Sequence, residues 1–243
     1  MRKFSLVLFW ATFSLLGQNS AKTCETLSKI NTLVQNEHFS PKPVDDSLSV
    51  YVFDTFIDGL DGNRNLFTKL EYEKLSKHRL KLDNYILQND CSFMNDFVAM
   101  YQFALERKKK TLEKIKAEVF EYNGKDTVKF SKKNFPFELT TNDFDRVWKK
   151  RMKYDILEDI SKLSSNLDSL NQNFATLEKT AKAKIFESNL CKINNILESK
   201  KGIGYDLQND FLNIFCSYFD PHTNFFSQDA RSSFMSSLTT SGL

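Results

Sequence analysis

The segment FDPHT, residues 219–223, places a carboxylate, Asp220, two residues from an imidazole, His222. A catalytic pair of this kind needs a nucleophile and a third group that orients the base, and neither stands nearby in the sequence. Pro221 between them favours a turn in which Asp220 caps the single helical turn that the proline begins. We therefore predict a structural role for this segment.

Other motifs of catalysis and metal binding are missing from the sequence. None of the three histidines belongs to an H-E-x-x-H motif, and there is neither a G-x-S-x-G elbow nor a Gly-rich phosphate loop. His38 precedes F-S-P-K-P and is interpreted as bracing a loop rather than binding a metal. The acidic residues follow a helical surface pattern, and no pair of them stands out for general acid and base catalysis. The sequence thus predicts no catalytic residue, no cofactor and no metal site.

The four cysteines, Cys24, Cys91, Cys191 and Cys216, lack the spacing of a metal site. Two interpretations stay open for them. One is a single disulfide, which persists in oxidising compartments, and the other is buried thiols that act as small hydrophobic side chains.

Residues 1–17, MRKFSLVLFWATFSLLG, carry two cations and then an apolar run, the layout of a secretory signal peptide. The run is shorter than the roughly 20 apolar residues of a spanning helix. We therefore predict a signal peptide over 1–21, cleaved between 17 and 21, export to the periplasm and no stable membrane span. An uncleaved anchor or a tail buried in the core is the alternative.

The remaining charge gives no electrostatic argument for binding nucleic acid. Removing the cations Arg2 and Lys3 lowers the formal net charge from +3 to +1. The run K-K-K at 108–110 lies in a helical pattern and is interpreted as a solvated helix face rather than a binding patch.

Composition and apolar spacing predict an all-α fold. Gly and Pro are few, at 7 and 4, whereas sheets with tight turns use more of both. Apolar residues recur at helical spacing along four stretches, namely Leu48 to Leu60, Phe93 to Val119, Phe144 to Ile156 and Leu207 to Tyr218. Further helical regions are expected over 167–197 and from near Ser227.

Capping signals and breakers mark the helix boundaries. Thr68 and Glu71 form a capping box that begins a second helix bearing Leu75, Leu82 and Ile86, and Ser92 is expected to cap the third helix. The pattern changes near 123–139, where Pro136 forbids a helix, so an extended or hairpin-like connection is expected there.

Three segments carry a family resemblance, and they are HFSPKPVDDSLSVYVFDTFIDGLDGNRNLF at 38–67, NDFDRVWKKRMKYD at 142–155 and SYFDPHTNFFSQDARSSFMSSL at 217–238. In this order they resemble the N-terminal helical domain of tail-specific proteases, the large periplasmic branch of the C-terminal processing serine peptidases. The family motif residues are His38, Phe39, Ser40, Pro41, Asp45, Asp46, Trp148, Arg151, Asp155, Phe219, Asp220, Pro221, His222 and Thr223. One departure is Asp61-Gly62, where the family usually has D-P, a change that a turn can absorb.

The resemblance implies a multi-helix N-terminal domain over 22–238, followed at 239–243 by the start of a PDZ domain. It makes the segment FDPHT a joint, and the family's catalytic serine and lysine match no position here. The implied function is a module that engages protein substrates or an adaptor protein and is inactive as a protease alone. PDZ and peptidase domains would be its partners if the gene continues. The alternative is a secreted helical interaction module unrelated to peptidases.

Overall fold

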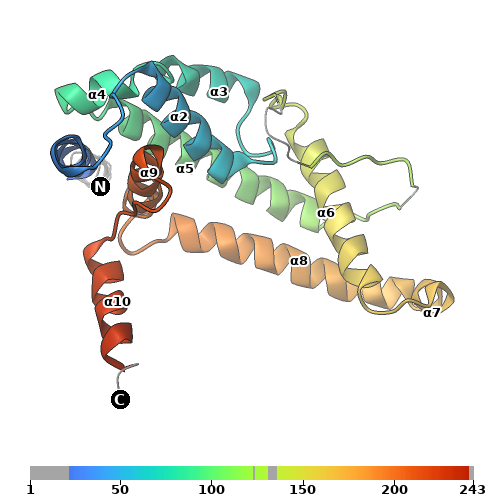
Figure 1. Cartoon of the computed structure of the whole chain (residues 1–243). Helices are drawn as coiled ribbons and strands as arrows, with labels where there is room; N and C mark the ends of the chain where they lie inside the picture. The colour runs from blue at the N-terminus through green and yellow to red at the C-terminus, as the bar shows by residue number, and fades with distance from the viewer. Residues whose placement is uncertain (1–21, 123, 131–135, 241–243) are drawn as a thin grey trace, which may run out of the picture. The chain divides into compact units, whose positions relative to one another are not determined.

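The computed structural model describes residues 22–122, 124–130 and 136–240 (Figure 1). All regular elements within these residues are helical and no strand occurs among them, which confirms the all-α prediction. A first helix covers 22–37, and after it come α2 (Asp46–Asp61), α3 (Lys69–Leu75), the 3₁₀ helix η1 (Ser76–His78), α4 (Leu82–Gln88), α5 (Ser92–Lys116), α6 (Phe144–Ser161), α7 (Leu167–Gln172), α8 (Phe174–Leu197), α9 (Ile203–Phe219) and α10 (Gln228–Thr240).

The helices form two compact units. The first combines the chain up to Leu60 with Leu75–Val98 and the chain from Lys201 onward, and the second combines Asp61–Lys74 with Ala99–Lys200. The predicted signal peptide lies outside the described residues. The expected start of a PDZ domain covers 239–243. Thr239 and Thr240 are the last residues of α10, and 241–243 lie outside the described residues. The signal peptide and the PDZ start therefore stay predictions.

Aromatic side chains form the core of the first unit. Phe56 of α2 lies 4.7 Å from Phe97 of α5 and 5.2 Å from Phe211 of α9, measured between ring centroids. Phe93 lies 5.6 Å from Phe211, and all four rings are buried. These residues belong to the apolar stripes that the sequence predicts, because helical spacing places them on one face of each helix.

Three of the four cysteines take one of the two predicted forms, and Cys191 takes neither. Cys24 in the first helix is bonded to Cys91, the residue before α5. Cys216 is a buried thiol, and burial raises its pKa to about 11, whereas Cys191 is an exposed thiol. The disulfide therefore ties two segments of the first unit that are distant in the sequence.

In the second unit, α6 buries the predicted stripe. Phe144, Trp148, Met152 and Ile156 are all buried, and α6 packs along α8 (Figure 1). The connection between α5 and α6 is extended, without a hairpin, over its described residues 124–130 and 136–139.

Three predicted helices differ from those in the structure. The second is divided into α3, η1 and α4, because i to i+3 bonds such as Arg79 N–H to Ser76 O at 3.1 Å replace the α-helical ones. The third ends at Lys116, which leaves Val119 exposed. The helical region 167–197 is interrupted at Asn173.

The cap of the third helix also differs from the prediction. Ser92 is the first helical residue of α5, and its backbone N–H donates to Asp90 Oδ1 at 2.8 Å. The sequence predicts that the side chain of Ser92 accepts the first backbone N–H groups of this helix, but the side chain of Asp90 accepts one instead. Both residue types are common helix caps.

Candidate functional site

The first and last family segments meet in the first unit. The Lys42 ammonium donates to the backbone carbonyl of Tyr218 and lies 4.8 Å from the centroid of its ring. Tyr51 Oη lies 3.1 Å from Ser217 Oγ. These contacts hold the loop before α2 against the last turn of α9, so two segments far apart in the sequence form one surface.

His38, Phe39, Ser40 and Pro41 form the loop before α2. His38 Nδ1 accepts the Ser40 N–H at 3.2 Å, the bracing contact expected of this histidine. The Phe39 ring is fully exposed, and Pro41 is also exposed. The loop is therefore a surface feature, and its role in the family motif stays a prediction.

Asp45 and Asp46 begin α2. The Asp45 carboxylate accepts the N–H of Ser47 at 2.8 Å and that of Leu48 at 3.4 Å, so it caps the helix. Asp46 is the first helical residue, where a negative charge interacts favourably with the helix dipole.

The segment FDPHT forms a turn after α9. Phe219 is buried, and Asp220 Oδ1 accepts the His222 N–H at 2.8 Å and lies 3.0 Å from His222 Nδ1. Thr223 N–H closes the turn on the Asp220 carbonyl at 3.0 Å, with Pro221 inside it. The hydrogen bonds from His222 hold the pKa of the Asp220 carboxyl below its usual value.

This geometry lacks the parts of a catalytic triad. The side chain of His222 is 93% exposed, and among the described residues no hydroxyl or thiol contacts its imidazole. Asp220 and His222 lie in a turn, as the sequence predicts, and the structural role of this turn stays a prediction.

A second histidine, His78, is buried in the first unit, where it contacts a partly exposed tyrosine and an exposed aspartate. His78 Nδ1 lies 3.0 Å from Tyr85 Oη, and His78 Nε2 lies 3.0 Å from Asp96 Oδ2. The sequence reasoning missed this cluster, because the three residues come from η1, α4 and α5 and share no motif. Its contacts join η1, α4 and α5.

The middle family segment lies on α6 in the second unit. Trp148 Nε1 donates to the carbonyl of Asn65 at 2.8 Å, and Arg151 Nε donates to Asp155 Oδ1 at 2.9 Å. Arg151 Nη1 is buried without an acceptor among the described residues. Trp148 thus anchors the loop that follows α2, the end of the first family segment.

Asp61 shapes this loop. Its carboxylate accepts the backbone N–H groups of Asn65, Leu66 and Phe67 at 2.9, 3.1 and 2.9 Å. Burial raises its pKa to about 6, against the opposing effect of these bonds. Arg64 has a φ of 52°, so the chain reverses sharply inside the loop.

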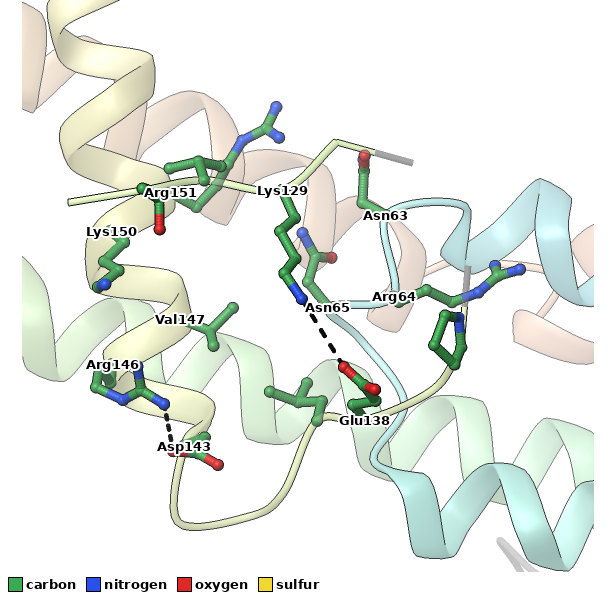
Figure 2. Close-up of a pocket in the computed structure, with 14 residues that line it drawn as sticks. Asn63, Arg64, Asn65, Lys129, Glu138, Asp143, Arg146, Val147, Lys150 and Arg151 are labelled. Carbon is green, nitrogen blue, oxygen red and sulfur yellow. Dashed lines mark hydrogen bonds and ion pairs between the residues drawn. The ribbon is translucent and has the colours of Figure 1, made fainter. Parts of the chain in front are cut away.

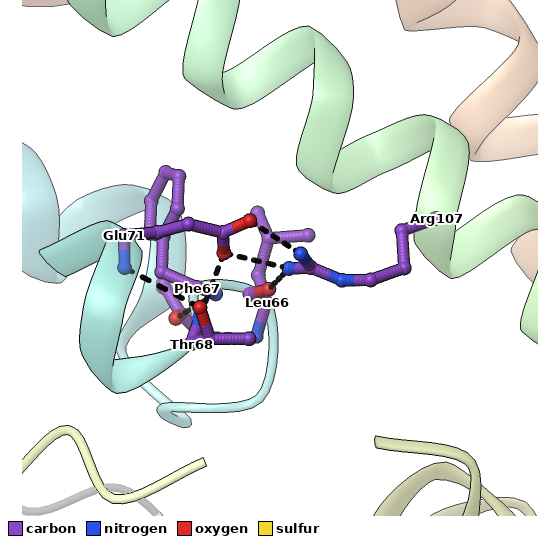
Figure 3. A network of polar contacts seen from close by, with 6 residues as sticks. Leu66, Phe67, Thr68, Glu71 and Arg107 are labelled. Carbon is purple, nitrogen blue, oxygen red and sulfur yellow. Dashed lines mark hydrogen bonds and ion pairs between the residues drawn. The ribbon is translucent and has the colours of Figure 1, made fainter. Parts of the chain in front are cut away.

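The end of the loop is held by a buried ion pair (Figure 3). Thr68 N–H donates to Glu71 Oε2 at 2.8 Å and Glu71 N–H to Thr68 Oγ1 at 3.3 Å, which confirms the predicted capping box. Arg107 of α5 bonds both Glu71 oxygens and donates to the Leu66 carbonyl at 2.6 Å. Burial alone would raise the Glu71 pKa, but the bonds from Arg107 and Thr68 outweigh it and lower that pKa.

A cationic pocket of about 370 Å³ opens beside this loop (Figure 2). Loop residues 63–65, the extended segments 127–129 and 136–139, and the first turns of α6 line it. Its cationic side chains are Arg64, Lys129, Arg146, Lys150 and Arg151, its acidic ones are Glu138 and Asp143, and Val128, Pro136, Leu139 and Val147 are apolar. The first and middle family segments therefore meet at this pocket.

Lys108 corrects the interpretation of the lysine run. Its ammonium lies 4.2 Å from the Trp148 ring centroid, and burial lowers its pKa to about 8 although nearby Asp61 opposes this. Of the run, Lys110 is exposed, so only part of it forms a solvated face.

Neither a metal-binding cluster nor a membrane-spanning helix occurs within the part of the chain that the structure describes. No group of three histidine, cysteine, aspartate or glutamate side chains is arranged to hold a metal ion there. None of the helices in that part has the length and hydropathy that crossing a bilayer requires.

Comparison with known proteins places the chain in a family. Residues 30–229 match the model of the tail specific protease N-terminal domain, so the chain belongs to this family. It is similar to a tail-specific protease of Haemophilus influenzae (strain ATCC 51907 / DSM 11121 / KW20 / Rd), with 26% identity over 215 residues. The match covers 88% of this chain and 29% of that relative, so the chain spans less than a third of the relative's length. The family match argues against a module unrelated to peptidases.

Proposed function

We propose that this chain is the protein-engaging, non-catalytic N-terminal module of an exported tail-specific protease. It engages extended segments of protein substrates or of an adaptor protein in the cell envelope. The observation that carries the proposal is the family match over residues 30–229, which spans both units of the structure.

The geometry of the described residues supports a non-catalytic role. Neither His78 nor His222 contacts a serine, threonine or cysteine side chain there, so neither has the nucleophile that a serine or cysteine peptidase requires. The Cys24–Cys91 disulfide supports export, because such bonds persist in oxidising compartments. The pocket beside Trp148 supports engagement of a ligand, since its volume is in the usual range of binding pockets.

The test uses the purified chain and an unfolded protein whose thiols are blocked by an uncharged reagent. Fluorescence anisotropy of the labelled protein measures binding, and gel electrophoresis measures cleavage. We expect saturable binding and intact unfolded protein after prolonged incubation. Absence of binding, or cleavage that copurifies with the chain and is abolished by His222→Ala, contradicts the proposal.

A further inference from the structure

The pocket beside the Trp148-anchored loop concentrates positive charge in a small volume. Five cationic and two acidic residues line it, so its lining has a net charge of +3 (5 − 2), as large as the formal net charge of the entire chain. A concave site in which one sign of charge predominates concentrates ligands of the opposite sign. The pocket is therefore suited to an anion.

Two of its cations stand one turn apart on α6. Arg146 and Lys150 are spaced by four residues and both line the pocket, and like charges at this spacing repel. An anion placed between two such side chains removes this repulsion and gains two charge-assisted hydrogen bonds.

The carboxylates near this pair are weak competitors. Asp143 binds Arg146 at 2.6 Å within one turn of exposed chain, and such local surface pairs contribute little. Asp126 lies 3.4 Å from Lys150 but only 2.5 Å from Lys153, so it is shared between two lysines. On the opposite wall, Glu138 lies 3.8 Å from Lys129 (Figure 2).

The rest of the lining points to the kind of anion. Val128, Pro136, Leu139 and Val147 add apolar surface to the same pocket. A small hydrated anion gains nothing from this surface, whereas an aliphatic side chain next to a carboxylate does. The volume of about 370 Å³ is at the small end of ligand pockets, which fits one or two residues of an extended peptide.

We infer that this pocket binds a carboxylate of an extended protein segment, held by Arg146 and Lys150, with a neighbouring aliphatic side chain on the apolar lining. This deepens the proposed function, on which it rests, by naming the chemistry of the segment that the module engages. The carboxylate comes either from an acidic side chain or from the C-terminus of the segment.

The experiment measures binding of fluorescent peptides to the full chain by anisotropy at low salt. The first peptide, Ala-Leu-Glu-Leu-Ala with both ends blocked, carries only a side-chain carboxylate. The second, Ala-Leu-Gln-Leu-Ala with a free C-terminus, carries only a terminal one, and the same peptide with both ends blocked carries none. We expect at least one carboxylate peptide to bind about tenfold more tightly than the uncharged one, and which one does so identifies the source.

A double variant tests the two cations. Arg146→Gln with Lys150→Gln is expected to weaken binding of the preferred peptide by about tenfold, which corresponds to the loss of about 1.4 kcal/mol. The matched control, Lys149→Gln with Lys162→Gln, makes the same change of charge at α6 and its C-terminal cap. Neither of these lysines lines the pocket, so neither can bond a carboxylate held in it, and the control is expected to change binding by less than about twofold. Thermal unfolding of both variants checks that each is folded.

Three results would overturn the inference. The first two are equal affinity for the charged and uncharged peptides, and equal weakening of binding in the two double variants. The third is that inorganic phosphate displaces the labelled peptide at the same concentration as the unlabelled peptide does. If the peptide experiment fails but the chain still binds the unfolded protein, only the carboxylate site is refuted. Loss of both kinds of binding refutes the proposed function as well.

Discussion

Replacing Arg107 by methionine is expected to destabilise the second unit strongly. The substitution keeps an unbranched apolar stem but leaves the Glu71 carboxylate, in a side chain only 10% exposed, without its cation. It also removes the donor to the Leu66 carbonyl. Breaking a buried pair in this way costs about 3–5 kcal/mol, and because the pair is not completely buried we expect about 3 kcal/mol.

A matched control lies two turns further along α5. Lys114 pairs with Asp145 at 2.6 Å, but the two side chains are 65% and 43% exposed. Lys114→Met should therefore cost much less stability than Arg107→Met, because exposed ion pairs contribute little. Adding Glu71→Gln to Arg107→Met should recover part of the loss, because the unpaired buried charge is then gone.

Urea unfolding followed by circular dichroism measures these free energies. The Glu71 pKa is lowered in the folded protein, so the stabilisation from its pair is present above the ordinary carboxyl pKa and is lost as the pH falls through the folded value. The gap between the unsubstituted chain and Arg107→Met should accordingly narrow in acid. A loss for Arg107→Met no larger than that for Lys114→Met, or a gap independent of pH, would refute this reasoning.

Three further predictions concern stability. Cys24→Ser removes the Cys24–Cys91 disulfide, whose cysteines are 67 residues apart in the sequence. It should lower the free energy of unfolding in urea, measured under oxidising conditions, by about 2–4 kcal/mol. The control Cys191→Ser, at an exposed thiol, should change this free energy little. Burial raises the Asp61 pKa from 3.8 to about 6, so its ionisation should lower the free energy of unfolding by about 2 kcal/mol as the pH rises from 4 to 7, and Asp61→Asn should lack this fall. Asp220→Ala removes the acceptor of the FDPHT turn and should lower the melting temperature in thermal unfolding, whereas an unchanged melting temperature would contradict this prediction.

The sequence by itself determined the local features of this protein. The Thr68 and Glu71 capping box, the buried stripe containing Phe144 and Trp148, and the turn at Asp220 were all predicted, since each depends on residues within a few positions of one another. The family segments were recognisable for the same reason, because each is a continuous run of residues.

Only the tertiary structure decided which of these local features meet. The pairing of Cys24 with Cys91 and the bond from Arg107 to Glu71 join residues that no short motif relates. Lys108 belongs to a run that looks solvated in the sequence, yet it is half-buried and its ammonium lies 4.2 Å from the centroid of the Trp148 ring on another helix. The pocket was missed because its walls come from three separate stretches of chain, and side-chain periodicity within one helix carries no information on what packs against it.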